Sequence, residues 1–207
     1  DAYGFDGLRG TELALKSYGL VPSATGTYIR GTLDVEEGLE KIASSGAEAV
    51  VMIGTYEPCA RFIRRAQEQG FHPIFYNVSF VGADELARRL GEAGEGVIVS
   101  QVVPPPELSD RLPDLNGVKE YVALLKRYFP ADRPNFVGLE GYVNARVLVE
   151  GLRRAGRNLD RDRFISAIES IRELDIGIAN RLSFSPLDHQ GLEQVYFTRI
   201  ENGHFVL

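Results

Sequence analysis

The residues best suited to bind a ligand lie in three short segments of this 207-residue sequence. Each segment opens a predicted helix or follows an apolar run, and together they hold Tyr3, Thr55, Tyr56, Asn77, Ser79 and Phe80. Their rings, hydroxyls and amide, with the N–H groups of a helix N-terminus, suit a small ligand that has a carboxylate or a similar polar end. None of these groups is reactive, so the pattern predicts binding without catalysis. An alternative stays open, in which the tyrosines pack at loop edges and the hydroxyls only cap helices.

The sequence carries no signature of a common enzyme class. It has no GxxxxGK[ST] loop, no GxGxxG after a predicted strand, no HExxH and no GxSxG. Cys59 and His72 could form a thiolate pair, but a cysteine on the inner face of an amphipathic helix is more often a small core residue. The three histidines, His72, His189 and His204, do not have a metal-binding spacing. We therefore predict no enzyme activity, no catalytic residue, no cofactor and no metal.

The composition is that of a globular chain with a sizeable core, since 44% of the residues are hydrophobic and 25% are charged. The net charge of −6 argues against a nucleic-acid partner, because such a protein would cluster Lys and Arg in a basic stripe. No run approaches the roughly 18 to 20 apolar residues of a membrane span. The single cysteine excludes an internal disulfide.

Apolar runs alternate with segments of helical period in the first half, which indicates an α/β arrangement with a parallel sheet. We expect helices at residues 5–18, 34–46, 55–70 and 83–90, and strands at residues 24–29, 49–53, 74–78 and 96–103. Asp34 and Glu37 form a capping-box pattern for the second helix. The run 49–53 has almost no polar residue, which favours a central strand covered by helices on both faces.

Three consecutive prolines at 104–106 mark a boundary, after which the pattern changes. Helices are expected at residues 117–129, 139–155 and 161–171 with no strand between them, followed by strands at 181–184, 194–200 and 204–207. Asn202 and Gly203 predict a tight hairpin between the last two strands.

The helix 139–155 is expected to bury one face against a sheet that this sequence does not contain. We therefore expect an exposed apolar patch at Val143, Val147, Leu148 and Leu152, and self-association of the chain through it. No predicted strand precedes the Tyr-Gly turn at Tyr3, where an α/β pattern needs one. Both features predict that the chain is part of a longer polypeptide.

Several short segments occur in the order and spacing of a known family. They are Ala2-Tyr3-Gly4, the run 48–54 followed by Thr55-Tyr56, the segment 62–66 before Gly70, Ser79-Phe80-Val81-Gly82, Gly94-Glu95-Gly96-Val97, the prolines after Val103, and Leu139-Glu140-Gly141-Tyr142. In these segments the chain resembles the extracellular solute-binding proteins of the branched-chain amino acid ABC transporter type, which have the type I periplasmic-binding fold. The resemblance covers the whole chain and rests on the order of the segments.

The resemblance implies a two-lobed protein that closes on its ligand, with most of the first lobe lying outside this chain. The fold class would be α/β, with a three-layer αβα lobe around a parallel sheet and helices that belong to a second, incomplete lobe. Residues 1–103 would form the α/β layer of the second lobe, residues 104–175 the helices that return to the first lobe, and residues 176–207 the closing strands of the second lobe.

The resemblance also implies ligand contacts for Tyr3 and Tyr56, because family members use aromatic residues at both positions. Ser79 stands where the amino-acid binders of the family carry an acidic residue that holds the ligand's ammonium group. A buried ammonium group without a counter-charge is destabilised by on the order of several kcal/mol. The serine therefore favours a neutral or anionic ligand, and an organic acid over an amino acid.

The function that the resemblance implies is binding of a small polar solute, either an organic acid or an amino-acid-like molecule, in a cleft between the lobes. The protein would be periplasmic or extracellular and would deliver its ligand to the permease of an ABC transporter. The alternative is the ligand-sensing extracellular domain of a receptor, with a signalling module as its partner. A signal peptide or lipobox upstream would favour transport, whereas a membrane span and a kinase or cyclase segment downstream would favour sensing.

Overall fold

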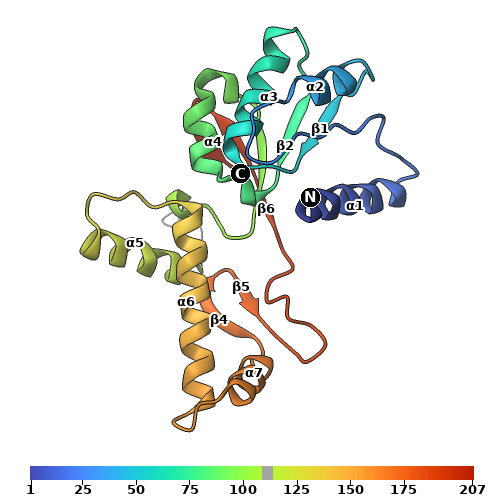
Figure 1. Cartoon of the computed structure of the whole chain (residues 1–207). Helices are drawn as coiled ribbons and strands as arrows, with labels where there is room; N and C mark the ends of the chain where they lie inside the picture. The colour runs from blue at the N-terminus through green and yellow to red at the C-terminus, as the bar shows by residue number, and fades with distance from the viewer. Residues whose placement is uncertain (109–113) are drawn as a thin grey trace. The chain divides into compact units, whose positions relative to one another are not determined.

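The computed structural model describes residues 1–108 and 114–207 of the chain. The chain divides into two compact units, which are described separately. Unit 1 consists of residues 1–100 and 197–207, and unit 2 of residues 101–196. Figure 1 shows the helices and strands of both units in chain order.

A five-stranded sheet forms the centre of unit 1, with the strand order β1-β2-β3-β6-β7. The strands are β1 (Ala49–Met52), β2 (Ile74–Asn77), β3 (Ile98–Gln101), β6 (Tyr196–Glu201) and β7 (His204–Val206). β1 pairs with β2 and β2 with β3 in parallel, whereas β6 and β7 pair antiparallel. Asn202 and Gly203 join the last pair with φ values of 52° and 77°, which confirms the predicted tight hairpin.

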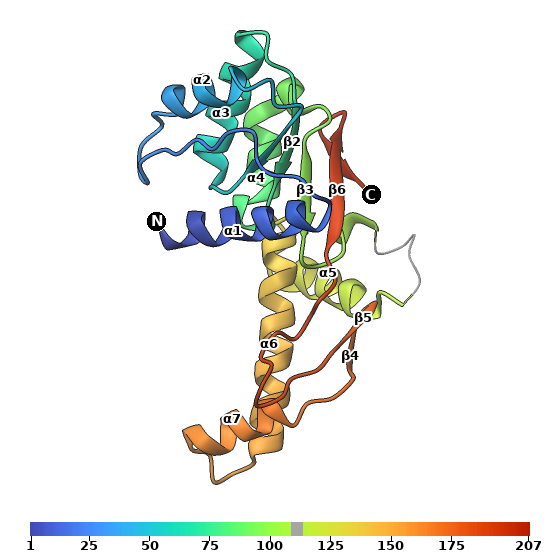
Figure 2. The same cartoon turned by 90° about the vertical axis from the view of Figure 1, so that its right-hand side faces the viewer.

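Three helices cover one face of this sheet: α2 (Glu36–Ala43), α3 (Tyr56–Glu68) and α4 (Ala83–Leu90) (Figure 2). Residues in β1 and β2 alternate in burial, so that Val50, Met52 and Phe75 are buried on the covered face. The ring of Phe62 in α3 meets the ring of Phe75 edge-on, with the ring centres 6.4 Å apart. All these helices and strands were predicted, and α4 has the predicted bounds.

The opposite face of the sheet is open to solvent in part. Val51, Ile74 and Phe197 keep 47%, 51% and 59% of their surface exposed. β1 is also the edge strand of the sheet. The expectation of a central strand covered on both faces is therefore wrong, because an apolar run reports that a strand is apolar and carries no information on which elements cover it.

The helix α1 (Ala2–Ser17) starts three residues earlier than predicted, because the Asp1 carboxylate accepts a hydrogen bond from the Gly4 N–H (3.0 Å) and caps it. Gly19 follows it with φ 71°, as predicted for a helix terminator. The predicted strand at residues 24–29 is wrong, since this segment is extended but pairs with no strand. Gly26 lies so close to α2 that a Cβ atom on it would be 2.8 Å from the Gly38 Cα atom.

The predicted capping box at the start of α2 is also wrong. The N-cap residue is Val35, and no side chain caps the helix. Two short 3₁₀ helices complete unit 1, η1 (Ser79–Val81) between β2 and α4 and η2 (Gly91–Gly94) before β3.

Unit 2 contains three helices and a two-stranded sheet: α5 (Asn116–Tyr128), α6 (Phe136–Ala155), α7 (Arg161–Glu169), β4 (Leu174–Ile178) and β5 (Asn180–Leu182), preceded by the 3₁₀ helix η3 (Pro106–Leu108). The helices confirm the prediction. α7 packs on α6 at Gly151, where a Cβ atom would be 2.4 Å from the Ile168 Cδ1 atom. β4 was missed, because Gly177 with φ 72° breaks the β pattern of its sequence.

The long helix α6 exposes apolar side chains, which are Val137, Leu148, Val149 and Leu152. The predicted patch is thus confirmed at Leu148 and Leu152, whereas Val143 is buried. Among the helices of the described residues, none is long and apolar enough to cross a bilayer.

We expect the 207-residue chain to associate through this patch. Its sedimentation coefficient should rise with concentration, and Leu148→Glu should remove that rise by placing a charge in the patch. Asn144→Glu is the matched control, since it adds the same charge at an exposed polar position of α6. A wild-type chain that sediments as a monomer at every concentration would contradict the prediction.

Candidate ligand-binding site

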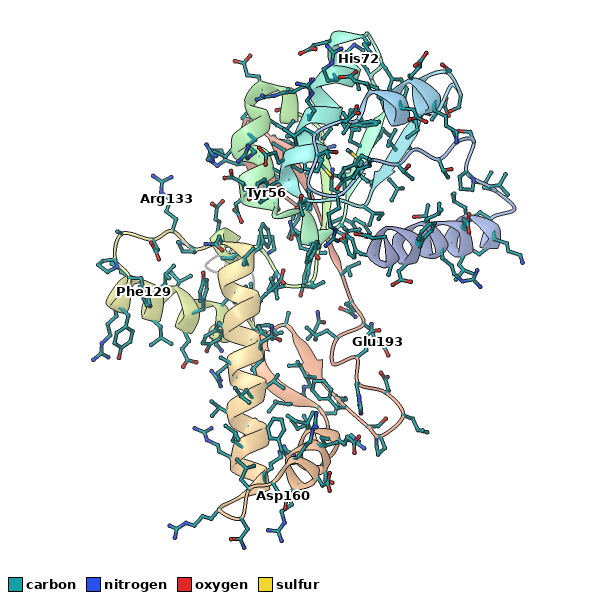
Figure 3. The ribbon with its side chains drawn as sticks, viewed as in Figure 1. Tyr56, His72, Phe129, Arg133, Asp160 and Glu193 are labelled. Atoms are coloured by element: carbon teal, nitrogen blue, oxygen red, sulfur yellow. The ribbon has the colours of Figure 1, made fainter. Side chains whose placement is uncertain are left out.

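Four of the predicted site residues, Thr55, Tyr56, Ser79 and Phe80, follow the carboxyl ends of β1 and β2, which lie at the same edge of the sheet because the two strands are parallel. Asn77 is the last residue of β2, and Tyr3 lies in the first turn of α1. Thr55 is the N-cap residue of α3, and Tyr56 is its first residue. Figure 3 shows Tyr56 at one end of α3 and His72 near the other. Ser79 and Phe80 lie in η1 after β2.

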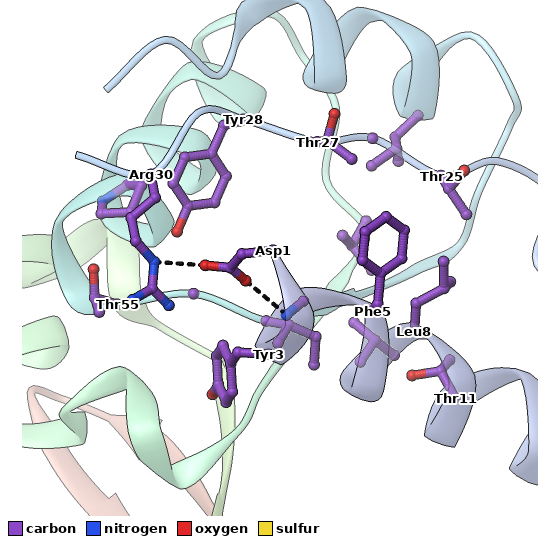
Figure 4. A pocket seen from close by; sticks show the side chains of 18 of the residues that line it. Asp1, Tyr3, Phe5, Leu8, Thr11, Thr25, Thr27, Tyr28, Arg30 and Thr55 are labelled. Carbon is purple, nitrogen blue, oxygen red and sulfur yellow. Dashed lines mark hydrogen bonds and ion pairs between the residues drawn. The ribbon is translucent and has the colours of Figure 1, made fainter. Parts of the chain in front are cut away.

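A cavity of about 1040 Å³ lies in unit 1, and we call it the strand-end cavity. Four predicted residues line it, namely Tyr3, Thr55, Tyr56 and Phe80. The lining residues that the sequence analysis missed include Asp1, Tyr28 and Arg30 (Figure 4). Asn77 and Ser79 are not among the lining residues. The sequence could have identified Tyr28 and Arg30, because they are two positions apart at the end of the expected strand 24–29 and alternate residues of a strand lie on one side.

Aromatic rings supply the apolar part of the strand-end cavity. The ring centres of Tyr3 and Phe80 lie 4.9 Å apart, with their planes inclined by 52°. Phe80 leaves 61% of its surface exposed, so its ring is available to a ligand. The Arg89 guanidinium lies over the Tyr56 ring, 5.0 Å from its centre, and so holds that ring by a cation–π contact.

An ion pair lies at the N-terminus of α1. The Asp1 carboxylate forms an ion pair with Arg30, with Oδ2 2.6 Å from Nε, and accepts a hydrogen bond from the Gly4 N–H at 3.0 Å through Oδ1. A second acid that lines the cavity, Glu57, pairs with Arg89 at 3.2 Å. Each acidic side chain of the lining is therefore neutralised by an arginine.

Two phenol groups, those of Tyr3 and Tyr28, belong to the same lining. The Tyr3 hydroxyl is buried and has no hydrogen-bond partner among the described residues. Burial raises the pKa of the Tyr3 phenol, and the nearby Cys59 and Tyr28 raise it further. Burial also raises the pKa of the Tyr28 phenol, which the backbone amide of Thr55 lowers in part. Both phenols are neutral at pH 7 and can donate a hydrogen bond to an anion.

Asn77 lies at the end of β2 on the covered face of the sheet, with only 3% of its surface exposed. Neither its amide oxygen nor its amide nitrogen has a partner within residues 1–108 and 114–207. A buried amide without partners destabilises a fold by about 1–3 kcal/mol for each unsatisfied group. The amide of Asn77 is thus available for a further hydrogen-bond partner.

Cys59 does not have the properties of a nucleophile. The side chain keeps only 3% of its surface exposed, and burial raises the pKa of its thiol to about 12. His72 is exposed and follows the far end of α3 (Figure 3). In the part of the chain that the structure describes, no group of three or more His, Cys, Asp or Glu residues is arranged to hold a metal.

The sequence profile of the periplasmic binding protein family matches residues 1–204. The chain belongs to the periplasmic binding protein family. This is a family of binding proteins and not of enzymes, and the resemblance stated from the sequence is confirmed. A comparison with curated protein sequences gives no match.

Solved structures of periplasmic binding proteins confirm the type I periplasmic-binding fold, with its mostly parallel sheet and its helices. A "possible leucine/isoleucine/valine-binding protein" from Rhodopirellula baltica SH 1 is 35% identical over 100% of this chain and 57% of its own, with a TM-score of 0.91. A substrate-binding periplasmic protein from Ralstonia solanacearum is 24% identical over 98% of this chain and 57% of its own, with a TM-score of 0.83. This chain thus spans a little over half of their length.

A branched-chain amino acid ABC transporter protein from Thermus thermophilus, solved with bound valine, is 21% identical over 85% of this chain and 48% of its own. Its TM-score of 0.68 shows the same fold.

Gly54→Ala should disturb the strand-end cavity. The added Cβ atom would lie 2.8 Å from the Tyr28 hydroxyl and 3.0 Å from Cys59 Sγ, so the Tyr28 ring must move. We expect a loss of about 1–3 kcal/mol in the free energy of unfolding, measured with urea. Gly10→Ala is the control, because nothing lies within 4 Å of the added atom in the exposed helix α1, and it should be neutral or stabilising by up to ~1 kcal/mol. If the two variants changed the free energy of unfolding equally, the space between Gly54 and the Tyr28 hydroxyl would be large enough for a methyl group, and the prediction would be wrong.

Cys59 should resist alkylation in the folded chain, because the thiolate is the reactive form and burial keeps the thiol protonated. Iodoacetamide at pH 8 should modify Cys59 many-fold faster in urea than in buffer, as followed by mass spectrometry. Equal rates in the two conditions would show an accessible thiol and would contradict the burial of Cys59.

Proposed function

We propose that this chain forms most of one lobe of a two-lobed protein that binds a small polar solute, an organic acid or an amino-acid-like molecule. Residues 1–103 and 176–207 would belong to the second lobe, and the helices within residues 104–175 would return to the first. The observation that carries the proposal is the gathering of Tyr3, Thr55, Tyr56 and Phe80 on one cavity beyond the carboxyl ends of parallel strands.

The chemistry of the strand-end cavity favours a ligand with an apolar body and a polar end. The paired rings of Tyr3 and Phe80 offer an apolar surface, and hydroxyl groups and an arginine lie on the same lining. Both carboxylates on the lining, those of Asp1 and Glu57, are paired with an arginine, which supports a ligand without an ammonium group. The lining therefore supports an organic acid more strongly than an amino acid.

Delivery of the ligand to the permease of an ABC transporter follows from the same proposal, with the protein in the periplasm or outside the cell. The support is membership of the periplasmic binding protein family and a fold shared with the Thermus thermophilus transporter protein.

A thermal-shift panel on a two-lobed polypeptide that contains this chain tests the proposed function. Aliphatic and aromatic acids should raise the melting temperature, and a ligand at about 100-fold its dissociation constant adds roughly 2.7 kcal/mol of stability. Tyr56→Ala should weaken the shift because it removes a lining ring, whereas Tyr18→Ala should not, since Tyr18 is 80% exposed outside the cavity. No shift with any acid or amino acid would overturn the proposed function.

A further inference from the structure

Arg30 is the one basic side chain that lines the strand-end cavity in the described structure. Two acidic side chains also line it, but Asp1 is paired with Arg30 and Glu57 is paired with Arg89. The lining thus offers no free carboxylate to a cationic ligand. The guanidinium of Arg30 is therefore the charged group of the lining that a ligand can use.

The geometry of the Asp1–Arg30 pair leaves part of the guanidinium available. Asp1 uses Oδ1 to cap α1 at the Gly4 N–H, which fixes its carboxylate, and its Oδ2 forms an ion pair with Arg30 Nε (Figure 4). The two Nη groups of Arg30 have no hydrogen bond to any other described residue. These groups remain as donors, and Arg30 keeps 73% of its side-chain surface exposed to receive a ligand.

The neighbouring groups add donors. The Tyr3 side chain lines the same cavity, and its hydroxyl is buried without a partner among the described residues. The Tyr28 phenol also lies on the lining, and its oxygen already accepts from the Thr55 backbone amide, so its proton is free to be donated. A guanidinium with a further phenol donor on the same lining complements a carboxylate, which has acceptor oxygens only.

We propose that Arg30 binds the carboxylate of an organic acid in the strand-end cavity, and that Asp1 is a positioning residue that holds the guanidinium by its Nε edge. This inference rests on the proposed function and narrows its ligand class to carboxylic acids that lack an ammonium group. The apolar body of the acid would lie on the ring pair of Tyr3 and Phe80, 4.9 Å apart. Arg30 alone would then account for tighter binding of the acid than of its uncharged analogues.

Isothermal titration of the two-lobed polypeptide with matched probes tests this assignment. The probes are phenylacetate and hexanoate, their primary amides, and the amino acids phenylalanine and leucine. The wild type should bind each acid at least about tenfold more tightly than its amide, because hydrogen bonds to charged groups are the stronger ones. Arg30→Gln should weaken binding of the acids by about 10- to 100-fold and leave binding of the amides within about twofold.

Two further variants separate binding from positioning. Asp1→Asn keeps an N-cap residue for α1 but removes the charge that orients Arg30, and it should weaken acid binding by a smaller factor, about three- to tenfold. Arg9→Gln is the control, since this exposed arginine of α1 does not line the cavity, and it should change nothing.

The outcomes separate this inference from the function on which it rests. Acids that bind equally well to the wild type and to Arg30→Gln would overturn the role of Arg30 and leave the binding function standing. Tighter binding of phenylalanine or leucine than of the matched acids would overturn the ligand class. A wild type that binds none of the probes would overturn both proposals.

Discussion

The parallel pairing of β1 with β2 is the constraint on which the rest of unit 1 depends. Its register runs from Ala49 opposite Ile74 to Met52 opposite Asn77, so the two strands end at the same level. The loops that follow must then leave the sheet at one edge, and α3 and η1 begin there. Part of the strand-end cavity forms beside those loops and the first turn of α1, and its lining continues along β1 and α1.

Burial is unequal on the two faces of the same sheet. α2, α3 and α4 seal one face, and the side chains there reach exposures near zero, as at Leu39, Ile63 and Leu86. On the other face Val51 and Ile74 remain about half exposed, and α1 buries no residue completely. Each Å² of apolar surface that is buried stabilises a fold by roughly 25 cal/mol, and the apolar surface that stays in water does not contribute. The hydrophobic stabilisation of unit 1 therefore comes from one side of its sheet, and the open side is a surface on which further chain or a partner would add stability.

Local signals predicted the helices well, and non-local pairing explains the errors. α4 was placed residue for residue, because its period and its flanking glycines act within one or two turns. The strand β1 was found but its position in the sheet was not, since sheet order depends on partners far away in sequence. The segment 24–29 has the composition of a strand and extended backbone, but no neighbouring strand pairs with it. In the site, Tyr56 and Phe80 were found because they follow predicted strands. Arg30 directly follows the expected strand 24–29 and was missed although it carries the same signal.

Burial determines the protonation state of three groups in or beside the strand-end cavity, namely Cys59, Tyr3 and Tyr28. Desolvation is the first cause that raises the pKa values of the Cys59 thiol and of the Tyr3 and Tyr28 phenols. The raised values keep all three groups protonated near neutral pH, and a protonated thiol is a poor nucleophile. The same desolvation that removes nucleophilic chemistry at Cys59 keeps the two phenols as neutral donors, which do not repel an anion as phenolates would. The lining thus presents neutral phenols and arginine–carboxylate pairs beside a protonated Cys59 thiol, which agrees with the proposed binding of a small molecule.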